Sequence, residues 1–169
     1  MAERRAMAAA PIVIAPCPAE RDPEAAAFLR RVFYDEFAFV PDPALDRDFE
    51  GLCAHYRRGR GELWIACVGD SIVATTAILD LTGGPGGDAE LKRMFVDRTM
   101  RGRGVGKGLL DVAVAHARAR GFDRIVLDST RDMRAAIGLY RAAGFREIPD
   151  YNGNQRADIF MALALHGPT

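Results

Sequence analysis

Hydrophobic residues change their spacing several times along the chain, and each change marks an expected element. Pro11–Ala15 is predicted to be a first strand. A helix is expected to begin at Asp22-Pro23, because proline is tolerated in the first helical turn, and its apolar side holds Phe28, Leu29, Val32, Phe33 and Phe37. After Val40–Asp42, the pattern predicts a second helix from about Pro43 to Arg58.

The middle of the chain has the spacing of strands. Leu63–Val68 and Ile72–Leu81 flank Gly69-Asp70, which predicts two antiparallel strands joined by a hairpin turn. Thr82–Asp88 is rich in glycine and is expected to be a mobile loop between strands. Glu90–Val96 follows as the fourth predicted strand.

The last third of the chain alternates between the hydrophobic spacing of helices and that of strands. From Val105 the apolar residues recur at helical spacing up to Ala117, with Gly121 as the expected stop. Arg124–Asp128 is predicted to be a core strand, Asp132–Ala143 a helix and Asp158–Leu165 a last strand. This order of elements predicts an α/β fold around a single core.

Composition agrees with one globular unit. The chain has 169 residues, of which 49% are hydrophobic, so we expect one domain over residues 1–169, with residues 1–10 as a flexible N-terminal extension. Arg4-Arg5 and the apolar stretch after them resemble a signal peptide, but Pro11 and the predicted first strand argue against one. The balance of 23 basic and 23 acidic residues argues against a nucleic-acid or membrane partner.

The cysteines and histidines do not suggest a metal or a disulfide framework. Cys17, Cys53 and Cys67 are odd in number and far apart, and the three histidines stand alone. We therefore expect no metal and a reducing, cytoplasmic location.

The richest local signal is Arg101–Gly108, a glycine-rich turn between a predicted strand and a predicted helix. Such a turn directs several backbone N–H groups of the helix N-terminus to one point, and glycine leaves room for a phosphate. Steric need alone also produces glycine-rich turns, but the strand-loop-helix order favours an anion site. The P-loop pattern fails, because Arg101 and Gly108 stand where it needs glycine and a hydroxyl, and the dinucleotide pattern also fails at its third glycine.

Two motifs resemble the GCN5-related N-acetyltransferase (GNAT) family. Arg101 to Gly106 fits that family's Arg-x-x-Gly-x-Gly acyl-CoA motif, and Leu139 to Phe145 fits its Leu-Tyr-x-x-x-Gly-Phe pattern. The resemblance covers about residues 71–165 and departs at Met133, where the family often has an asparagine that contacts the pantetheine arm. It implies a mixed central sheet that splays between strands 4 and 5, with helices on both faces, and acetyl-CoA as co-substrate.

The resemblance also implies roles for individual residues. CoA would be bound by the end of the fourth strand and the loop after it, through Met94, Phe95, Val96, Arg101, Gly102, Arg103, Gly104, Val105, Gly106 and Lys107. Tyr140 would donate a proton to the departing thiolate, unless it is a core residue with its hydroxyl satisfied. Glu90 is placed like the general base of histone acetyltransferases, although a solvated or arginine-paired glutamate is the alternative.

The predicted activity is therefore acetyl transfer from acetyl-CoA to a primary amine, and the expected acceptor is a small molecule such as an amino acid or related metabolite. The alternatives are a protein N-terminal or lysine acetyltransferase, and a catalytically inert acyl-CoA-binding regulatory module. The acceptor is expected against the two N-terminal helices and the loop Pro149–Arg156, where Asn152, Asn154 and Arg156 either bind a carboxylate or are turn residues. A nucleotide-binding protein is the remote alternative, and a homodimer is left open as the assembly.

Overall fold

The computed structural model describes residues 10–166, which build one seven-stranded sheet in the order β1-β2-β3-β4-β5-β7-β6. The strands are β1 (Ile12–Pro16), β2 (Glu62–Val68), β3 (Ser71–Asp80), β4 (Asp88–Val96), β5 (Arg124–Ser129), β6 (Arg146–Ile148) and β7 (Ile159–Ala164). Neighbouring strands run antiparallel except β4 and β5, which are parallel. The hairpin predicted at Gly69-Asp70 joins β2 to β3.

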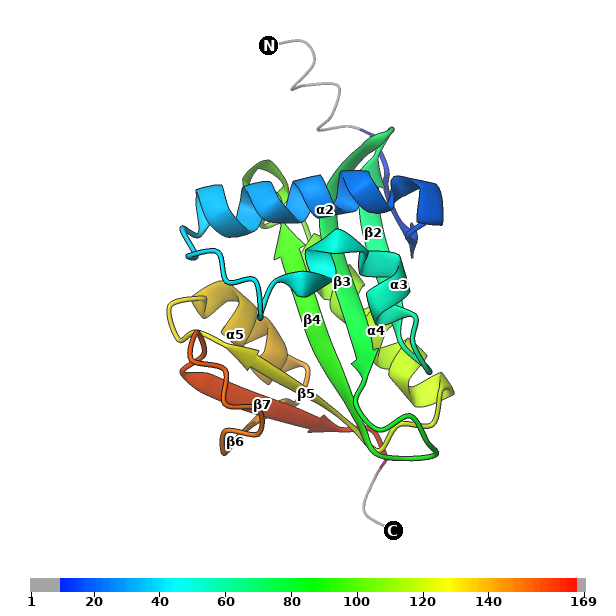
Figure 1. Ribbon diagram of the computed structural model, residues 1–169, viewed down its shortest axis with the longest axis vertical. Helices are drawn as coiled ribbons and strands as arrows, with labels where there is room; N and C mark the ends of the chain where they lie inside the picture. Colours follow the sequence, from blue (N-terminus) through cyan, green and yellow to red (C-terminus); the bar gives the residue numbers. More distant parts are fainter. Residues whose placement is uncertain (1–9, 167–169) are drawn as a thin grey trace.

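Helices cover both faces of this sheet (Figure 1). The α-helices are α2 (Asp22–Arg30), α3 (Leu52–Tyr56), α4 (Val105–Ala119) and α5 (Arg134–Ala142). A π-helical segment, η2 (Arg31–Glu36), prolongs α2, and short 3-10 turns are η1 (Ala19–Arg21), η3 (Arg47–Glu50) and η4 (Arg98–Met100). α2 and α3 pack on one face around Leu29 and Leu52, and α4 and α5 pack on the other around Leu109 and Leu127. The alternation of apolar side chains along the strands supplies both cores.

The parallel pair β4 and β5 separates after a short contact. Asp88–Glu90 pairs with Arg124–Val126, and beyond Glu90 no strand among the described residues pairs with the β5 side of β4. Figure 1 shows β5 and β7 turning away from β4 along the rest of its length. The predicted α/β fold with a splay between strands 4 and 5 is thus confirmed.

A bulge in β4 marks the level of this splay. The register with β3 shifts between Thr75 and Ala77, so that two β4 residues, Arg93 and Met94, stand opposite one. Arg93 has φ +51°, and its carbonyl oxygen accepts a hydrogen bond from the Thr75 hydroxyl at 2.8 Å. The bulge bends β4 and re-aims its side chains just where the strand leaves β5.

The helix predicted over Pro43–Arg58 is wrong in its extent. Only η3 and the five-residue α3 form there, separated by Gly51 in an extended conformation. Asp46 interrupts the helix because its carboxylate accepts the Asp42 amide at 2.8 Å and the Tyr34 hydroxyl at 2.8 Å. The first amides of α3, on Leu52 and Cys53, donate instead to the Asp22 carboxylate at the start of α2.

The predicted N-terminal extension, residues 1–10, overlaps the described residues only at Ala10. Residues 1–9, with the apparent basic start of a signal peptide, lie outside the described residues. Ala10, which the prediction included in the extension, packs against the core on the α4 side. None of the helices within residues 10–166 has the length and hydropathy needed to cross a bilayer.

Candidate active site

Two hollows meet at the splay. A groove of about 550 Å³ runs from the start of α4 to the start of α5, along the end of β4. A pocket of about 120 Å³ opens on the α2 side between β4, β5 and the loop before β7. Met94, Phe95 and Met133 line both, so a molecule in the groove and one in the pocket can reach each other.

The glycine loop forms one end of the groove. Gly104 is the residue before α4 and has φ +79°, and Gly102 has φ +74°, a left-handed conformation that favours glycine. A Cβ at either position would meet no heavy atom within 4 Å, so both positions face open space. The first bond of α4 is donated by Gly108 to the Gly104 carbonyl at 3.0 Å. The amides of the three preceding residues have no acceptor within the described part of the chain.

The groove brings together the predicted CoA-binding residues, with one exception. It is lined by Met94, Phe95, Val96, Arg101, Gly102, Gly104, Val105, Gly106 and Lys107. Arg103 is not part of the lining, and one of its guanidinium nitrogens lies 3.2 Å from the Met100 sulfur. Met133 stands in the wall just before α5, where it offers a thioether in place of the family's asparagine amide.

The basic side chains at the loop differ in their surroundings. Arg101 donates to the Val96 carbonyl at 3.0 Å and to the Glu36 carboxylate at 2.8 Å, and it lies over the Phe37 ring. Lys107 is 70% exposed and pairs with Asp111 one turn along α4. Lys107 therefore offers a solvated charge, whereas Arg101 connects the loop to the end of η2.

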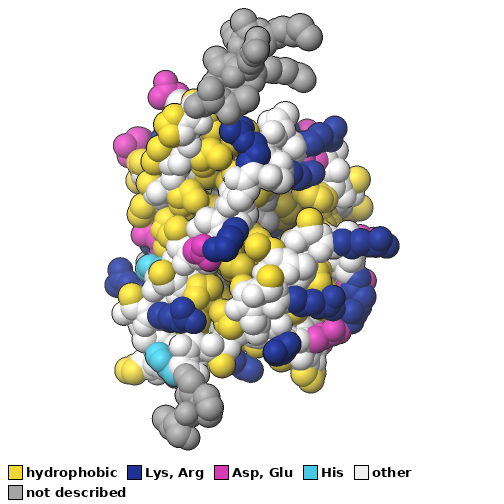
Figure 2. Space-filling view, turned by 180° about the vertical axis from the view of Figure 1, so that it is seen from behind, with side chains coloured by type: hydrophobic (Ala, Val, Ile, Leu, Met, Phe, Trp, Pro, Cys, Tyr) yellow, Lys and Arg dark blue, Asp and Glu magenta, His cyan; other side chains and the backbone are white. Residues whose placement is uncertain are grey.

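Hydrophobic surface accompanies these charges on the α4 and α5 side of the molecule. Figure 2 looks onto that face and shows apolar side chains between scattered lysines and arginines. The groove has the same mixed character, because methionine and phenylalanine side chains form its middle and a helix N-terminus forms its end. Such a site suits a ligand with an anionic end and a long, weakly polar arm.

Glu90 lies at the level where β4 leaves β5. It is 5% exposed, and its carboxylate accepts hydrogen bonds from the Tyr151 hydroxyl at 2.7 Å and from the Asn152 amide at 3.2 Å. Lys92 lies 3.6 Å from the same oxygen. Glu90 is not part of the pocket lining, so a proton from the pocket would reach it through Lys92 or a water molecule.

Tyr140 does line the pocket. Its side chain is buried on α5, and no hydrogen-bond partner for its hydroxyl occurs among residues 10–166. Burial, and then the nearby Asp128 carboxylate, raise the pKa of Tyr140, so its hydroxyl keeps its proton at neutral pH. A protonated tyrosine with a free hydroxyl is suited to donating a proton.

Asp128 is a pocket residue that the sequence analysis did not single out. It lies near the end of β5, where its carboxylate accepts from the amides of Asn152 at 2.6 Å and Asn154 at 3.0 Å and from Lys92 at 3.4 Å. Burial alone would raise the pKa of Asp128, but Lys92 and the two amides outweigh it and hold the pKa below its ordinary value. Asp128 is therefore ionised at neutral pH.

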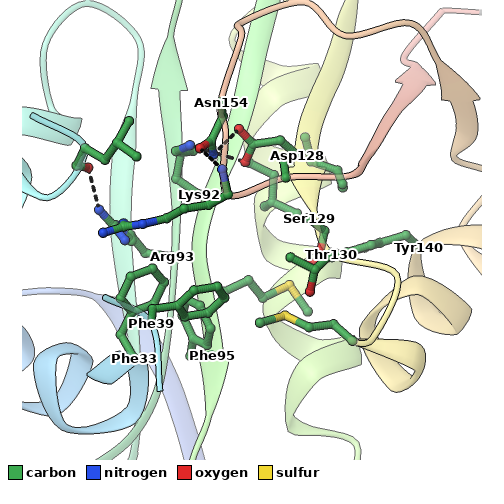
Figure 3. Close-up of a pocket in the computed structure, with 17 residues that line it drawn as sticks. Phe33, Phe39, Lys92, Arg93, Phe95, Asp128, Ser129, Thr130, Tyr140 and Asn154 are labelled. Atoms are coloured by element: carbon green, nitrogen blue, oxygen red, sulfur yellow. Dashed lines mark hydrogen bonds and ion pairs between the residues drawn. The ribbon is translucent and has the colours of Figure 1, made fainter. Parts of the chain in front are cut away.

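The loop before β7 supplies those amides through ordinary turn geometry. Asn152 Oδ1 accepts the Asn154 amide, and Asn154 Oδ1 accepts the Arg156 amide, each at 3.0 Å. The side-chain nitrogens of both asparagines are thereby turned to Asp128, as Figure 3 shows for Asn154. The carboxylate that they bind in this structure is the protein's own.

Two largely buried arginines, Arg93 and Arg156, form the opposite wall of the pocket. Arg93 holds Asp48 through two hydrogen bonds of 2.7 and 2.8 Å, and Arg156 holds Asp46 through two of 2.7 and 3.0 Å. Both guanidinium groups also lie over the ring of Phe33. These pairs connect β4 and the loop before β7 to the segment after α2, and they fix the aromatic wall. No cluster of histidine, cysteine and acidic side chains within the described residues could hold a metal ion.

Comparison with known proteins gives a consistent picture. A family model described as the acetyltransferase (GNAT) family matches residues 21–145. An uncharacterized N-acetyltransferase of Escherichia coli, YjgM, is 34% identical over 112 residues, which are 66% of this chain and 64% of that protein. The chain spans about half to two thirds of the length of the curated relatives that it matches.

Solved structures share the fold. An acetyltransferase of the GNAT family from Staphylococcus aureus superposes with a TM-score of 0.81 and 26% identity, over 92% of this chain and all of that one. A predicted acetyltransferase with acetyl-CoA from Clostridium acetobutylicum has a TM-score of 0.69 and 20% identity, over 84% of this chain and 94% of that one. The latter likeness shows the fold alone.

Proposed function

Because the chain belongs to the GNAT acetyltransferase family, we propose that it transfers an acetyl group from acetyl-CoA to a primary amine of a small molecule, a class that includes amino acids and related metabolites. The observation that carries this proposal is the meeting of the two hollows at Met94, Phe95 and Met133. One hollow fits an anionic, elongated molecule, and the other is a compact pocket with titratable groups. The small size of the pocket favours a small acceptor.

The groove fits CoA by its chemistry. The free amides at the start of α4 would hold the pyrophosphate, because Gly102 and Gly104 leave the approach open. Arg101 and Lys107 would add positive charge, while Arg103 would add charge beside the groove. The polar backbone of Met94–Val96, which pairs with no strand on its β5 side and whose Val96 carbonyl accepts from Arg101, would bind the pantetheine arm. When bound, acetyl-CoA supplies the acetyl group as a thioester.

Different residues at the pocket carry out the two proton transfers, one from the amine and one to the thiolate. Free amines have pKa values of roughly 8 to 10, so a base increases the reactive fraction at neutral pH. Glu90 takes this role through a water molecule, because Tyr151 and Asn152 cover its carboxylate. A backbone N–H near Phe95 or Val96 polarises the thioester carbonyl. Tyr140 donates its proton to the thiolate.

A thiol-release assay with acetyl-CoA tests this function against the alternatives. The panel contains small amines, amino acids, and peptides with free N-termini or lysines, and the acetylated product is identified by mass spectrometry. Turnover with small amines supports the proposal, whereas turnover only with peptides makes the chain a protein acetyltransferase. CoA binding without turnover on any acceptor makes it an inert binding module. The cytoplasmic location and a homodimer stay predictions.

A further inference from the structure

We propose that Asp128 receives the ammonium group of the acceptor, and that the acceptor is a compact primary amine on an apolar or aromatic body without a neighbouring carboxylate. This inference rests on the proposed function, since it names the substrate class for the same pocket. It follows from the hydrogen bonds of Asp128, the charges around it, the side chains that line the pocket, and the pairing of the two arginines with carboxylates of the protein.

The Asp128 carboxylate has room for one more donor. Its Oδ2 atom accepts from two asparagine amides, at 2.6 and 3.0 Å. Its Oδ1 atom has a single partner among the described residues, the Lys92 ammonium at 3.4 Å, which is longer than a strong charged hydrogen bond. Because Asp128 lines the pocket, Oδ1 can accept from an ammonium group there.

The charges at this end of the pocket leave a surplus of one negative charge. Lys92 lies 3.6 Å from Glu90 and 3.4 Å from Asp128, so one ammonium is shared by two carboxylates. Tyr151 and Asn152 cover Glu90, and the surplus charge therefore faces the pocket from Asp128. Burial of an unbalanced charge is unfavourable, and a cationic ligand removes that cost.

Part of the remaining wall is apolar and sets the size of the ligand, while Ser129 and Thr130 also line the pocket. Phe33, Phe39 and Phe95 stand together below Asp128 and Lys92 in Figure 3, and Leu45 also lines the pocket. Phe33 and Phe39 stack with ring centroids 4.3 Å apart, which gives a flat aromatic surface. The volume is about 120 Å³. An engineered apolar cavity of about 150 Å³ binds benzene, so a pocket of this size with an open side takes a group of about one ring.

The arginines do not offer a site for a carboxylate. Arg93 and Arg156 each already bind a carboxylate of the protein through two hydrogen bonds, to Asp48 and Asp46 respectively. The charge of each arginine is thus already balanced, so a carboxylate of the acceptor would meet no surplus positive charge there and would be repelled by Asp128, which is unfavourable in a buried pocket. The pocket therefore discriminates against free α-amino acids and favours amines that lack that group.

Binding to the CoA-loaded full chain tests the inference without chemistry, because free CoA carries no acetyl group. The probes are 2-phenylethylamine, the neutral isostere 2-phenylethanol, and phenylalanine, which differs from the amine by one carboxylate. We expect calorimetry to show at least tenfold tighter binding of the amine than of either other compound. Equal affinities for the amine and the alcohol would overturn the role of Asp128, and equal affinities for the amine and phenylalanine would overturn the exclusion of carboxylates.

A substitution of Asp128 tests whether this residue causes the preference for the amine. Asp128→Asn keeps the shape and is expected to reduce amine affinity about tenfold while 2-phenylethanol affinity and CoA affinity stay within twofold. The matched control is Asp35→Asn, which removes one carboxylate that is exposed on η2 and outside both hollows. If Asp128→Asn lost affinity for the amine and for the alcohol equally, the role of Asp128 would be structural only. The comparison of ligands on the parent protein remains decisive if this variant does not fold.

The same ligands separate this inference from the proposed function. If the amine binds as expected but is not acetylated when acetyl-CoA replaces CoA, the activity fails and the ammonium site stands. If peptides are acetylated while none of the three compounds binds, the ammonium site and the substrate class fail and acetyl transfer stands.

Discussion

Replacement of Gly104 by aspartate separates the proposed phosphate site from the local fold. Gly104 has φ +79°, and a Cβ there meets no heavy atom within 4 Å. The folded protein therefore loses only the conformational preference of glycine, about 1 kcal/mol. For a chain of this length, such a loss lowers the Tm by about 2–4 °C. Gly104→Asn is the matched control, because it has nearly the same size and conformational cost but no charge.

The charge determines the effect on CoA. A carboxylate about 6 Å from each of two phosphate charges, in water-like surroundings, is repelled by about 0.7 kcal/mol per charge. Two charges give about 1.4 kcal/mol, which is about a tenfold loss of affinity. The carboxylate can also accept from the free amides of α4 and so compete with the phosphate for them. Gly104→Asp is therefore expected to bind CoA at least tenfold more weakly than Gly104→Asn.

Calorimetric titration of CoA into both variants and the parent measures this difference, and thermal unfolding shows whether each variant is folded. Raising the salt concentration to about 1 M should reduce the gap between aspartate and asparagine, because salt screens exposed charges. Equal CoA affinities of the two folded variants would refute the phosphate site at the start of α4.

Three further substitutions probe the pocket and its support. Glu90→Gln should lower the rate chiefly near neutral pH and recover part of it at high pH, where the amine deprotonates unaided; parallel pH profiles would point to a structural Glu90. Tyr140→Phe should lower kcat by about 10²-fold with little change in the acetyl-CoA KM, and a kcat within about threefold of the parent, with chemistry limiting turnover, would make Tyr140 a core residue. Asp48→Asn should reduce the free energy of unfolding by about 3 kcal/mol at pH 7, because Arg93 loses its buried partner. Burial alone would raise the pKa of Asp48, but Arg93 outweighs burial and holds the pKa below its ordinary value, so the stabilisation is present above the unfolded pKa of about 3.9 and is lost as the pH falls further. Denaturant unfolding of parent and variant at pH 7 and pH 3 should therefore show a smaller difference in the free energy of unfolding at pH 3. A difference that stays constant would contradict this role of the pair.

The parts of the fold that sequence predicts are those that depend on local pattern. The helix from Val105 and the hairpin at Gly69-Asp70 follow from spacing and glycine alone, and both occur in the structure. The helix over Pro43–Arg58 fails because Asp46 accepts the Asp42 amide, and because Asp46 and Asp48 also bind Arg156 and Arg93, which are distant in sequence. No local pattern shows that a carboxylate will have such a partner.

The same distinction applies to the candidate site. Most of the predicted CoA-binding residues line one groove because they are consecutive in a loop and at a strand end. Lys92, in the middle of β4, and Asp128, near the end of β5, were missed because only the pairing of β4 with β5 brings them together. A charged side chain near the open end of the splay is a usable signal once the strand order is known.

The short pairing of β4 with β5 has a mechanical consequence. Three residue pairs join the two halves of the sheet, so hydrogen bonds between strands do little to fix the distance across the opening. Polar contacts such as that of Lys92 with Asp128 cross the opening, and beneath it the two halves are separated by an apolar core, where Leu91 of β4 and Leu127 of β5 pack with Ile137 and Tyr140 of α5. The width of the active-site opening is thus a property of side-chain volume in the core. Changes of one methylene at Leu91, Leu127 or Ile137 are therefore expected to alter which molecules enter.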